Sequence, residues 1–156
     1  GQIGASFIYY GSADGFSDAR REQIPTYNSY ENAIADFDRD GWLDIALCSY
    51  GDYYRDGVSQ NCPTLLHWGG PDGFGARPYT ELEAYVSSGI EAADFDGDGR
   101  PDLLISNHRQ TGSIAEPIPQ RHVTQSMLYW GGPDGFSPRE RWETEDTSPT
   151  FAANQA

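Results

Sequence analysis

The sequence predicts an all-β protein, a β-propeller fragment of about two and a half four-stranded antiparallel blades. Two repeated motifs support this prediction. A turn motif occurs as YYGSADGFS, HWGGPDGFG and YWGGPDGFS, and its aligned glycines Gly11, Gly69 and Gly131 lie 58 and 62 residues apart. A second motif, ADFDRDGWLDIAL, returns 58 residues later as ADFDGDGRPDLLI. A recurring unit that holds four short strands is typical of a propeller blade.

The composition favours strands and tight turns, and it argues against two classes of partner. Aromatic residues make up 13% of the 156 residues, and Gly and Pro are frequent. These residue types prefer strands and turns over helices. The net charge of −14 would repel nucleic acid. No apolar run approaches the roughly 20 residues that span a bilayer, so we expect no membrane insertion.

Each full repeat divides into four expected strands. Apolar and β-branched runs alternate with the Asp-rich motif, a longer loop and the GGPDG turn, where Gly supplies the positive φ that closes a hairpin. The first full repeat has expected strands at about 32–36, 44–49, 64–68 and 74–83. The second has them at about 89–94, 102–107, 126–130 and 136–143.

These strands divide the chain into four segments. Residues 1–30 are expected to be the last two strands of a first blade, and residues 148–156 the start of a next one. Residues 31–87 and 88–147 are expected to be full blades, each with an Asp-rich loop. Closed propellers need about four to eight blades, so we expect the remaining blades to come from a longer chain or from other copies. The alternative is a small stand-alone β-sandwich.

The two Asp-rich loops predict two Ca²⁺ sites. Carboxylates stand at loop positions one, three, five and nine, Gly stands at six, and position seven would offer its backbone carbonyl. The predicted ligands are Asp36, Asp38, Asp40, Trp42 and Asp44 in the first loop, and Asp94, Asp96, Asp98, Arg100 and Asp102 in the second. An EF-hand is excluded because Leu47 and Ile105 hold the position of its essential Glu. The alternative is a solvated acidic turn, which two copies in register with a repeat disfavour.

These motifs resemble the FG-GAP/VCBS repeats of bacterial surface and secreted proteins and of integrin α-subunit propellers. The matching pieces are ADFDRDGWLDIAL, ADFDGDGRPDLLI, YYGSADGFS and the two WGGPDGF turns. The resemblance implies a propeller of roughly seven blades, an extracellular or cell-surface location, and a role in adhesion or ligand binding. The Asp positions named above match the calcium ligands of that family.

Cys48 and Cys62 predict a disulfide. Cys48 falls in an expected strand and Cys62 just before its antiparallel neighbour, and the next repeat has Ser106 and Thr124 in their places. A disulfide would suit an oxidising compartment. The alternative is a pair of buried thiols.

The loops between the second and third strands of each repeat are candidates for recognition. They differ in length and chemistry, and strand alternation should place them on the face opposite the Asp loops. Specificity is usually carried by variable loops on a rigid scaffold, and Tyr and Arg are frequent at binding hot spots. The candidate residues are Tyr53, Tyr54, Arg55, His108 and Arg109. The alternative is that they pack on their own blades.

Together these features predict a non-enzymatic calcium-binding module for extracellular adhesion or ligand binding, whose partner is an extracellular protein or a glycan. Two alternatives are a carbohydrate-binding lectin and a structural building block of a surface assembly. A hydrolase would need a site elsewhere, because the sequence holds no GxSxG, HExxH or phosphate-binding loop.

Overall fold

The computed structural model describes residues 4–50, 62–107 and 125–143, with side chains up to Phe136 in the last stretch. These residues form ten strands and one 3-10 helix, η1, which confirms the all-β prediction. The elements are β1 Gly4–Tyr9, η1 Asp18–Arg20, β2 Arg21–Thr26, β3 Ser29–Ala35, β4 Asp44–Ser49, β5 Thr64–His67, β6 Thr80–Leu82, β7 Ser87–Ala93, β8 Asp102–Asn107, β9 Met127–Gly132 and β10 Gly135–Glu143. In this described part of the chain, no helix has the length and apolarity needed to cross a membrane.

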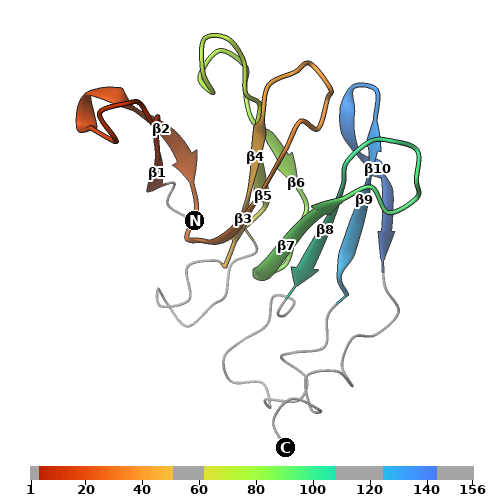
Figure 1. Ribbon diagram of the computed structural model, residues 1–156. Helices are drawn as coiled ribbons and strands as arrows, with labels where there is room; N and C mark the ends of the chain where they lie inside the picture. The colour runs from red at the N-terminus through yellow and green to blue at the C-terminus, as the bar shows by residue number, and fades with distance from the viewer. Residues whose placement is uncertain (1–3, 51–61, 108–124, 144–156) are drawn as a thin grey trace, which may run out of the picture.

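The strands form three antiparallel sheets in which neighbours follow chain order. β1 and β2 make a two-stranded sheet, here called the half-blade. The strands β3 to β6 make the first full blade, and β7 to β10 make the second. Figure 1 shows the three sheets standing side by side, as the blades of a propeller do. The prediction of four-stranded antiparallel blades is therefore confirmed.

One expected strand is much shorter than predicted. The strand expected at 74–83 is reduced to the three residues of β6, whereas its counterpart β10 spans nine residues. The reason is a contact distant in sequence. The backbone N–H groups of Phe74 and Gly75 each donate to the Glu22 carboxylate of β2 at 2.9 Å. They therefore tie the turn to the half-blade instead of extending the pairing with β5.

The main core lies between the two full blades. Successive residues of a strand point to opposite faces, so every second residue of β4 faces the second blade, and every second residue of β8 faces the first. The buried cluster includes Ala33, Ala46, Cys48, Leu66 and Trp68 from the first blade and Ile90, Leu103, Ile105, Met127 and Tyr129 from the second. Small residues on β3 and β4 let the two sheets approach closely.

Hydrogen bonds also join the two full blades. The Ser49 N–H donates to Ser87 Oγ at 3.0 Å, and that hydroxyl donates back to the Ser49 carbonyl at 3.2 Å. The Ile90 N–H donates to Glu31 Oε2 at 3.3 Å. These bonds fix how β3 and β4 sit against β7, because each donor and acceptor has a defined partner across the interface.

The disulfide predicted between Cys48 and Cys62 is not formed, and both side chains are buried thiols. β4 pairs with β5 so that Leu47 lies opposite Leu65. Continuing that register leaves Cys48 two residues out of step with Cys62. Diagonal neighbours of this kind are about 7–8 Å apart, beyond the Cα separation that a disulfide spans. Burial raises the pKa of the Cys48 thiol and keeps it neutral.

The interface between the full blades should dominate stability. We predict that Leu103→Ala, at a fully buried position, lowers the free energy of unfolding by about 2–5 kcal/mol in a denaturant titration. The control is Leu43→Ala at a position that is 61% exposed, which should cost less than about 0.5 kcal/mol. Equal losses at the two positions would contradict this placement of the core.

Candidate functional site

The two Asp loops connect β3 to β4 and β7 to β8, and both make the sharp turn that their glycines predict. Gly41 and Gly99, at loop position six, have φ of 93° and 85°, a region that residues with a Cβ rarely adopt. The turn directs backbone N–H groups at the first carboxylate of each loop. In the first loop, the N–H groups of Asp40 and Gly41 donate to the two oxygens of Asp36, each at 3.0 Å.

Three carboxylates converge in each loop. Within each set, one oxygen per residue lies within 4.8 Å of the others. The sets are Asp36, Asp38 and Asp40 in the first loop, and Asp94, Asp96 and Asp102 in the second. Carboxylates held so close repel one another, and hard oxygen donors are what Ca²⁺ prefers. The donor sets therefore fit a hard divalent cation.

The remaining predicted ligands have other contacts. Asp98 pairs with the side chain of Arg100, whose Nε lies 3.4 Å from Asp98 Oδ2. Asp44 lies outside the first converging set. The contributions expected from the backbone carbonyls of Trp42 and Arg100 remain predictions.

The ninth loop position has a role that sequence reasoning missed. Asp44 is completely buried, and its two oxygens accept the N–H groups of Phe37 and Gly69, each at 2.8 Å. Asp102 repeats the arrangement with Phe95 at 2.7 Å and Gly131 at 2.8 Å. The buried carboxylate therefore accepts the same two kinds of N–H group in both full blades, one from its loop and one from its turn. We call this contact the carboxylate bridge, because it joins the Asp loop to the WGG turn of the same blade.

The carboxylate bridge explains the first glycine of each WGG turn. A Cβ on Gly69 would lie 2.1 Å from the carbonyl oxygen of Leu43, and one on Gly131 would lie 2.3 Å from that of Pro101. Only glycine allows the turn to come this close to the Asp loop. A Cβ on the corresponding Gly11 of the half-blade would lie 3.6 Å from its nearest neighbour, the Phe16 ring.

Electrostatics at Asp44 favour a nearby cation. Burial raises the pKa of Asp44 to about 6, and the charges of Asp38 and Asp40 raise it as well, against the opposing effect of the N–H groups of Gly69 and Phe37. The ionised carboxylate is thus poorly solvated and has acidic neighbours. A divalent cation in the loop would relieve this repulsion.

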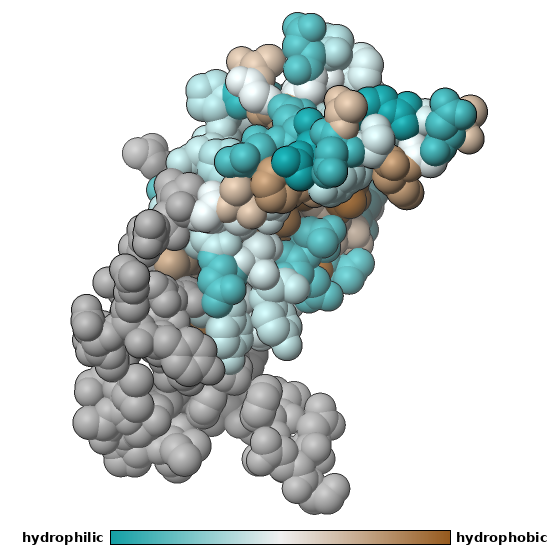
Figure 2. Space-filling view, turned by 90° about the vertical axis from the view of Figure 1, so that its left-hand side faces the viewer, coloured by the Kyte–Doolittle hydropathy of each residue, from teal (hydrophilic) through white to brown (hydrophobic). Residues whose placement is uncertain are grey.

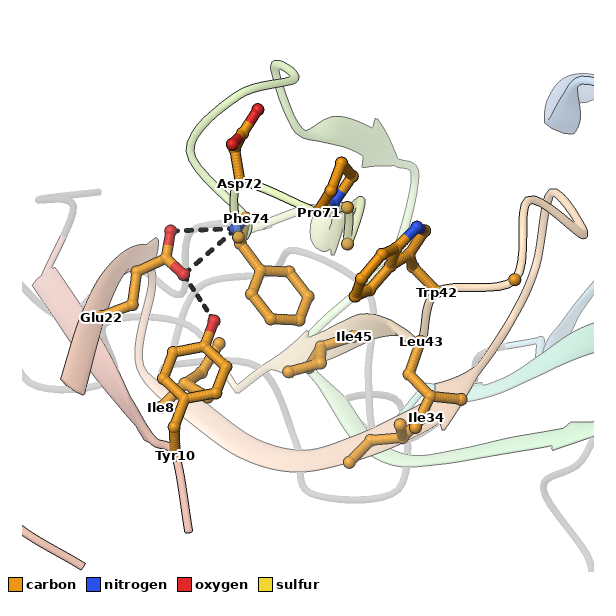
Figure 3. Close-up of a pocket in the computed structure, with 14 residues that line it drawn as sticks. Ile8, Tyr10, Glu22, Ile34, Trp42, Leu43, Ile45, Pro71, Asp72 and Phe74 are labelled. Atoms are coloured by element: carbon orange, nitrogen blue, oxygen red, sulfur yellow. Dashed lines mark hydrogen bonds between the residues drawn. The ribbon is translucent and has the colours of Figure 1, made fainter. Parts of the chain in front are cut away.

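An apolar groove of about 740 Å³ lies between the half-blade and the first full blade (Figure 3). Ile8, Ile34, Ile45 and the ring of Phe74 are among its lining residues. At one wall, Glu22 accepts the hydroxyl of Tyr10 at 2.7 Å as well as the N–H of Phe74. Seen from the side of the half-blade, apolar surface lies among polar side chains (Figure 2).

The repeat shows what covers the equivalent surface of the second full blade. At the 58-residue spacing, Ile34 corresponds to Ala92, Ile45 to Leu103 and Leu47 to Ile105. Leu103 and Ile105 are completely buried, because β3 and β4 pack against their blade. Ile45, the counterpart of Leu103, is only half-buried, and Ile34 beside it is 54% exposed. Among the described residues, no strand pair covers β3 and β4 in the way that these two strands cover β7.

The predicted recognition residues Tyr53, Tyr54, Arg55, His108 and Arg109 lie outside the described residues. Their proposed position opposite the Asp loops therefore remains a prediction. The same strand alternation places the Asp loops and the WGG turns together on the other face. The structure agrees, because the carboxylate bridges hold each Asp loop beside the WGG turn of its own blade.

In comparison with known families, residues 36–105 match the FG-GAP-like repeat. This stretch runs from the first Asp loop through the first WGG turn and the second Asp loop into β8. The match thus covers the two Asp motifs and the first WGGPDGF turn, whereas YYGSADGFS and the second WGGPDGF turn, which also carry the resemblance, lie outside it. No curated protein matches the chain.

Gly69 and Gly11 align in sequence, but the close approach at the carboxylate bridge should make only Gly69 intolerant of a side chain. We predict that Gly69→Ala lowers the free energy of unfolding by about 1–3 kcal/mol, because the added methyl collides with the Leu43 carbonyl. Gly11→Ala is the matched control and should change it by less than about 0.5 kcal/mol. Thermal or denaturant unfolding of the two variants measures the difference, and a tolerated Gly69→Ala would argue against the close approach.

Proposed function

We propose that this chain, which carries an FG-GAP-like repeat, is a calcium-binding segment of a β-propeller that serves as a non-enzymatic extracellular module for adhesion or ligand binding. The observation that carries the proposal is the pair of Asp loops. In two successive blades, each loop gathers three carboxylates, from positions one, three and five in the first loop and from positions one, three and nine in the second. Each loop is joined to the WGG turn of its own blade by a carboxylate bridge.

The proposed role of the ion is structural. Calcium would be held by the three converging carboxylates of each loop. Its positive charge would offset the repulsion between them. Asp44 and Asp102 would transmit that order to the WGG turns, because each already bonds one N–H of its loop and one N–H of its turn. An ordered face of this kind would support recognition loops elsewhere on the blade.

The extracellular location is proposed on two grounds. Extracellular calcium modules bind their ion with dissociation constants of about 10⁻⁴–10⁻³ M, a range that suits loops as exposed as the second one, where Asp94 and Asp96 are open to solvent. The Asp loops and turns also resemble the FG-GAP/VCBS repeats of bacterial surface and secreted proteins.

A second candidate function, a building block of a larger assembly, is favoured by the apolar groove. In the second full blade the equivalent surface is covered by β3 and β4 of the blade before it. The groove would therefore accept an inner strand pair of the same kind, supplied by another repeat in the same or a neighbouring chain. The serine at the start of β3, Ser29, corresponds to Ser87, which makes the interblade hydrogen bonds to Ser49.

Calcium binding can be tested loop by loop. Isothermal titration calorimetry of the full chain should detect two sites, and chelation should lower the melting temperature because the ion binds only the folded state. Asp36→Asn and Asp94→Asn should each abolish one site and leave the other.

Asp72→Asn is the control for a lost surface charge, since Asp72 is exposed and outside both loops. It should keep both sites. A chain that shows no heat of calcium binding and melts at the same temperature with and without chelator would refute the proposed function.

The assembly function predicts self-association through the groove. Sedimentation velocity should show a sedimentation coefficient that rises with protein concentration, and Ile34→Ser should reduce that rise because it removes an exposed apolar side chain from the groove. Phe16→Ser is the matched control, since Phe16 is 74% exposed and lies outside the groove. Equal effects of the two substitutions would indicate non-specific association.

A further inference from the structure

Arg77 places a positive charge against the first Asp loop. It lies in the connection between β5 and β6, 39 residues from Asp38 in sequence, and its guanidinium donates to Asp38 Oδ2. The Asp38 side chain is only 12% exposed. A charged contact of this kind is stronger when one partner is shielded from water.

The guanidinium is held in place by a second contact. Its carbon lies 3.9 Å from the centroid of the Trp68 ring, a cation–π arrangement. The Trp68 ring is fixed in turn, because it is buried in the core and its Nε1 donates to Thr80 Oγ1 at 3.0 Å. Arg77 is therefore positioned between a candidate metal ligand and a rigid aromatic face.

In the first loop, this arrangement gives a candidate ligand a cationic partner from outside the loop. Asp38 belongs to the converging set of three carboxylates, and one of its oxygens is already taken by Arg77. In the second loop the described cationic contact is different. Arg100 comes from the loop itself and pairs with Asp98, which is not in the converging set.

We propose that Arg77 is a built-in counter-ion of the first Asp loop, which neutralises Asp38 when no metal is bound and competes with the divalent cation for it. The proposal rests on the proposed calcium-binding function and adds a residue that sets affinity. A cation entering the loop must either displace the guanidinium or bind beside its positive charge, and both weaken binding. The recurrence of arginine at the aligned position 139 of the next repeat shows that the residue is part of the repeated pattern.

The proposal predicts two linked effects, one on calcium affinity and one on stability. Removing Arg77 should tighten calcium binding at the first loop, and it should destabilise the calcium-free protein more than the calcium-saturated one. By thermodynamic linkage, the gain in affinity must equal the difference between the two losses of stability. A residue that merely supports the fold would destabilise both forms alike.

The experiment measures both quantities in the full chain with the second loop disabled by Asp94→Asn. In that background, Arg77→Gln should lower the calcium dissociation constant by about twofold to fivefold, as measured by calorimetry. It should also lower the melting temperature in chelator more than in saturating calcium. Arg77→Lys keeps the charge, so its affinity should stay closer to that of the unsubstituted residue than to that of Arg77→Gln.

Arg39→Gln is the matched control. Arg39 lies in the same loop and carries the same charge, but its side chain is exposed, so its loss should change the dissociation constant by less than about twofold. An Arg77→Gln variant with unchanged or weaker binding would overturn the proposal, as would an equal gain from Arg39→Gln. An unsubstituted first loop that takes up no calcium would instead defeat the proposed function, and this proposal with it.

Discussion

The structure of each full blade depends on one buried carboxylate at the ninth position of its Asp loop. Asp44 and Asp102 each accept two backbone N–H groups, one from the loop and one from the WGG turn. A buried carboxylate without such partners would be costly, so the loop and the turn have to meet where these two N–H groups point. The glycine of the turn follows from this contact, because a side chain there would collide with the loop backbone.

The same loop also connects the blades. Phe37, directly after the first loop aspartate, is completely buried, and its ring lies 5.1 Å from that of Phe136 at the start of β10 in the next blade. The second loop has Phe95 at the equivalent position, where it is 46% exposed. Ordering the first loop would therefore bear on the interblade core as well as on the candidate metal centre. The loop joins three parts of the fold: the carboxylates, the turn of its own blade and the core of the interface.

Sequence reasoning predicted the features that are local or that repeat. The bounds of β4 and β8, the positive φ of Gly41 and Gly99, and the four-stranded sheets follow from turn chemistry and periodicity. It missed features that depend on residues distant in sequence. Glu22 shortens the strand before Leu82 from 52 residues away, and Arg77 reaches Asp38 across 39 residues. The predicted disulfide failed for a related reason, because the strand register that separates the two cysteines is set by the pairing of whole strands.

The two loop phenylalanines bear on how a chain of this kind grows. Phe37 and Phe95 occupy the same slot in successive units, and only the first meets the last strand of a following blade within the described residues. Each unit therefore encodes both halves of a joint: a ring that projects forward and a last strand that receives the ring of the unit before it. A tandem duplication of one such unit would bring a compatible joint at both of its borders. The number of blades can then change through duplication of a repeat in the gene, and no new interface between blades has to evolve.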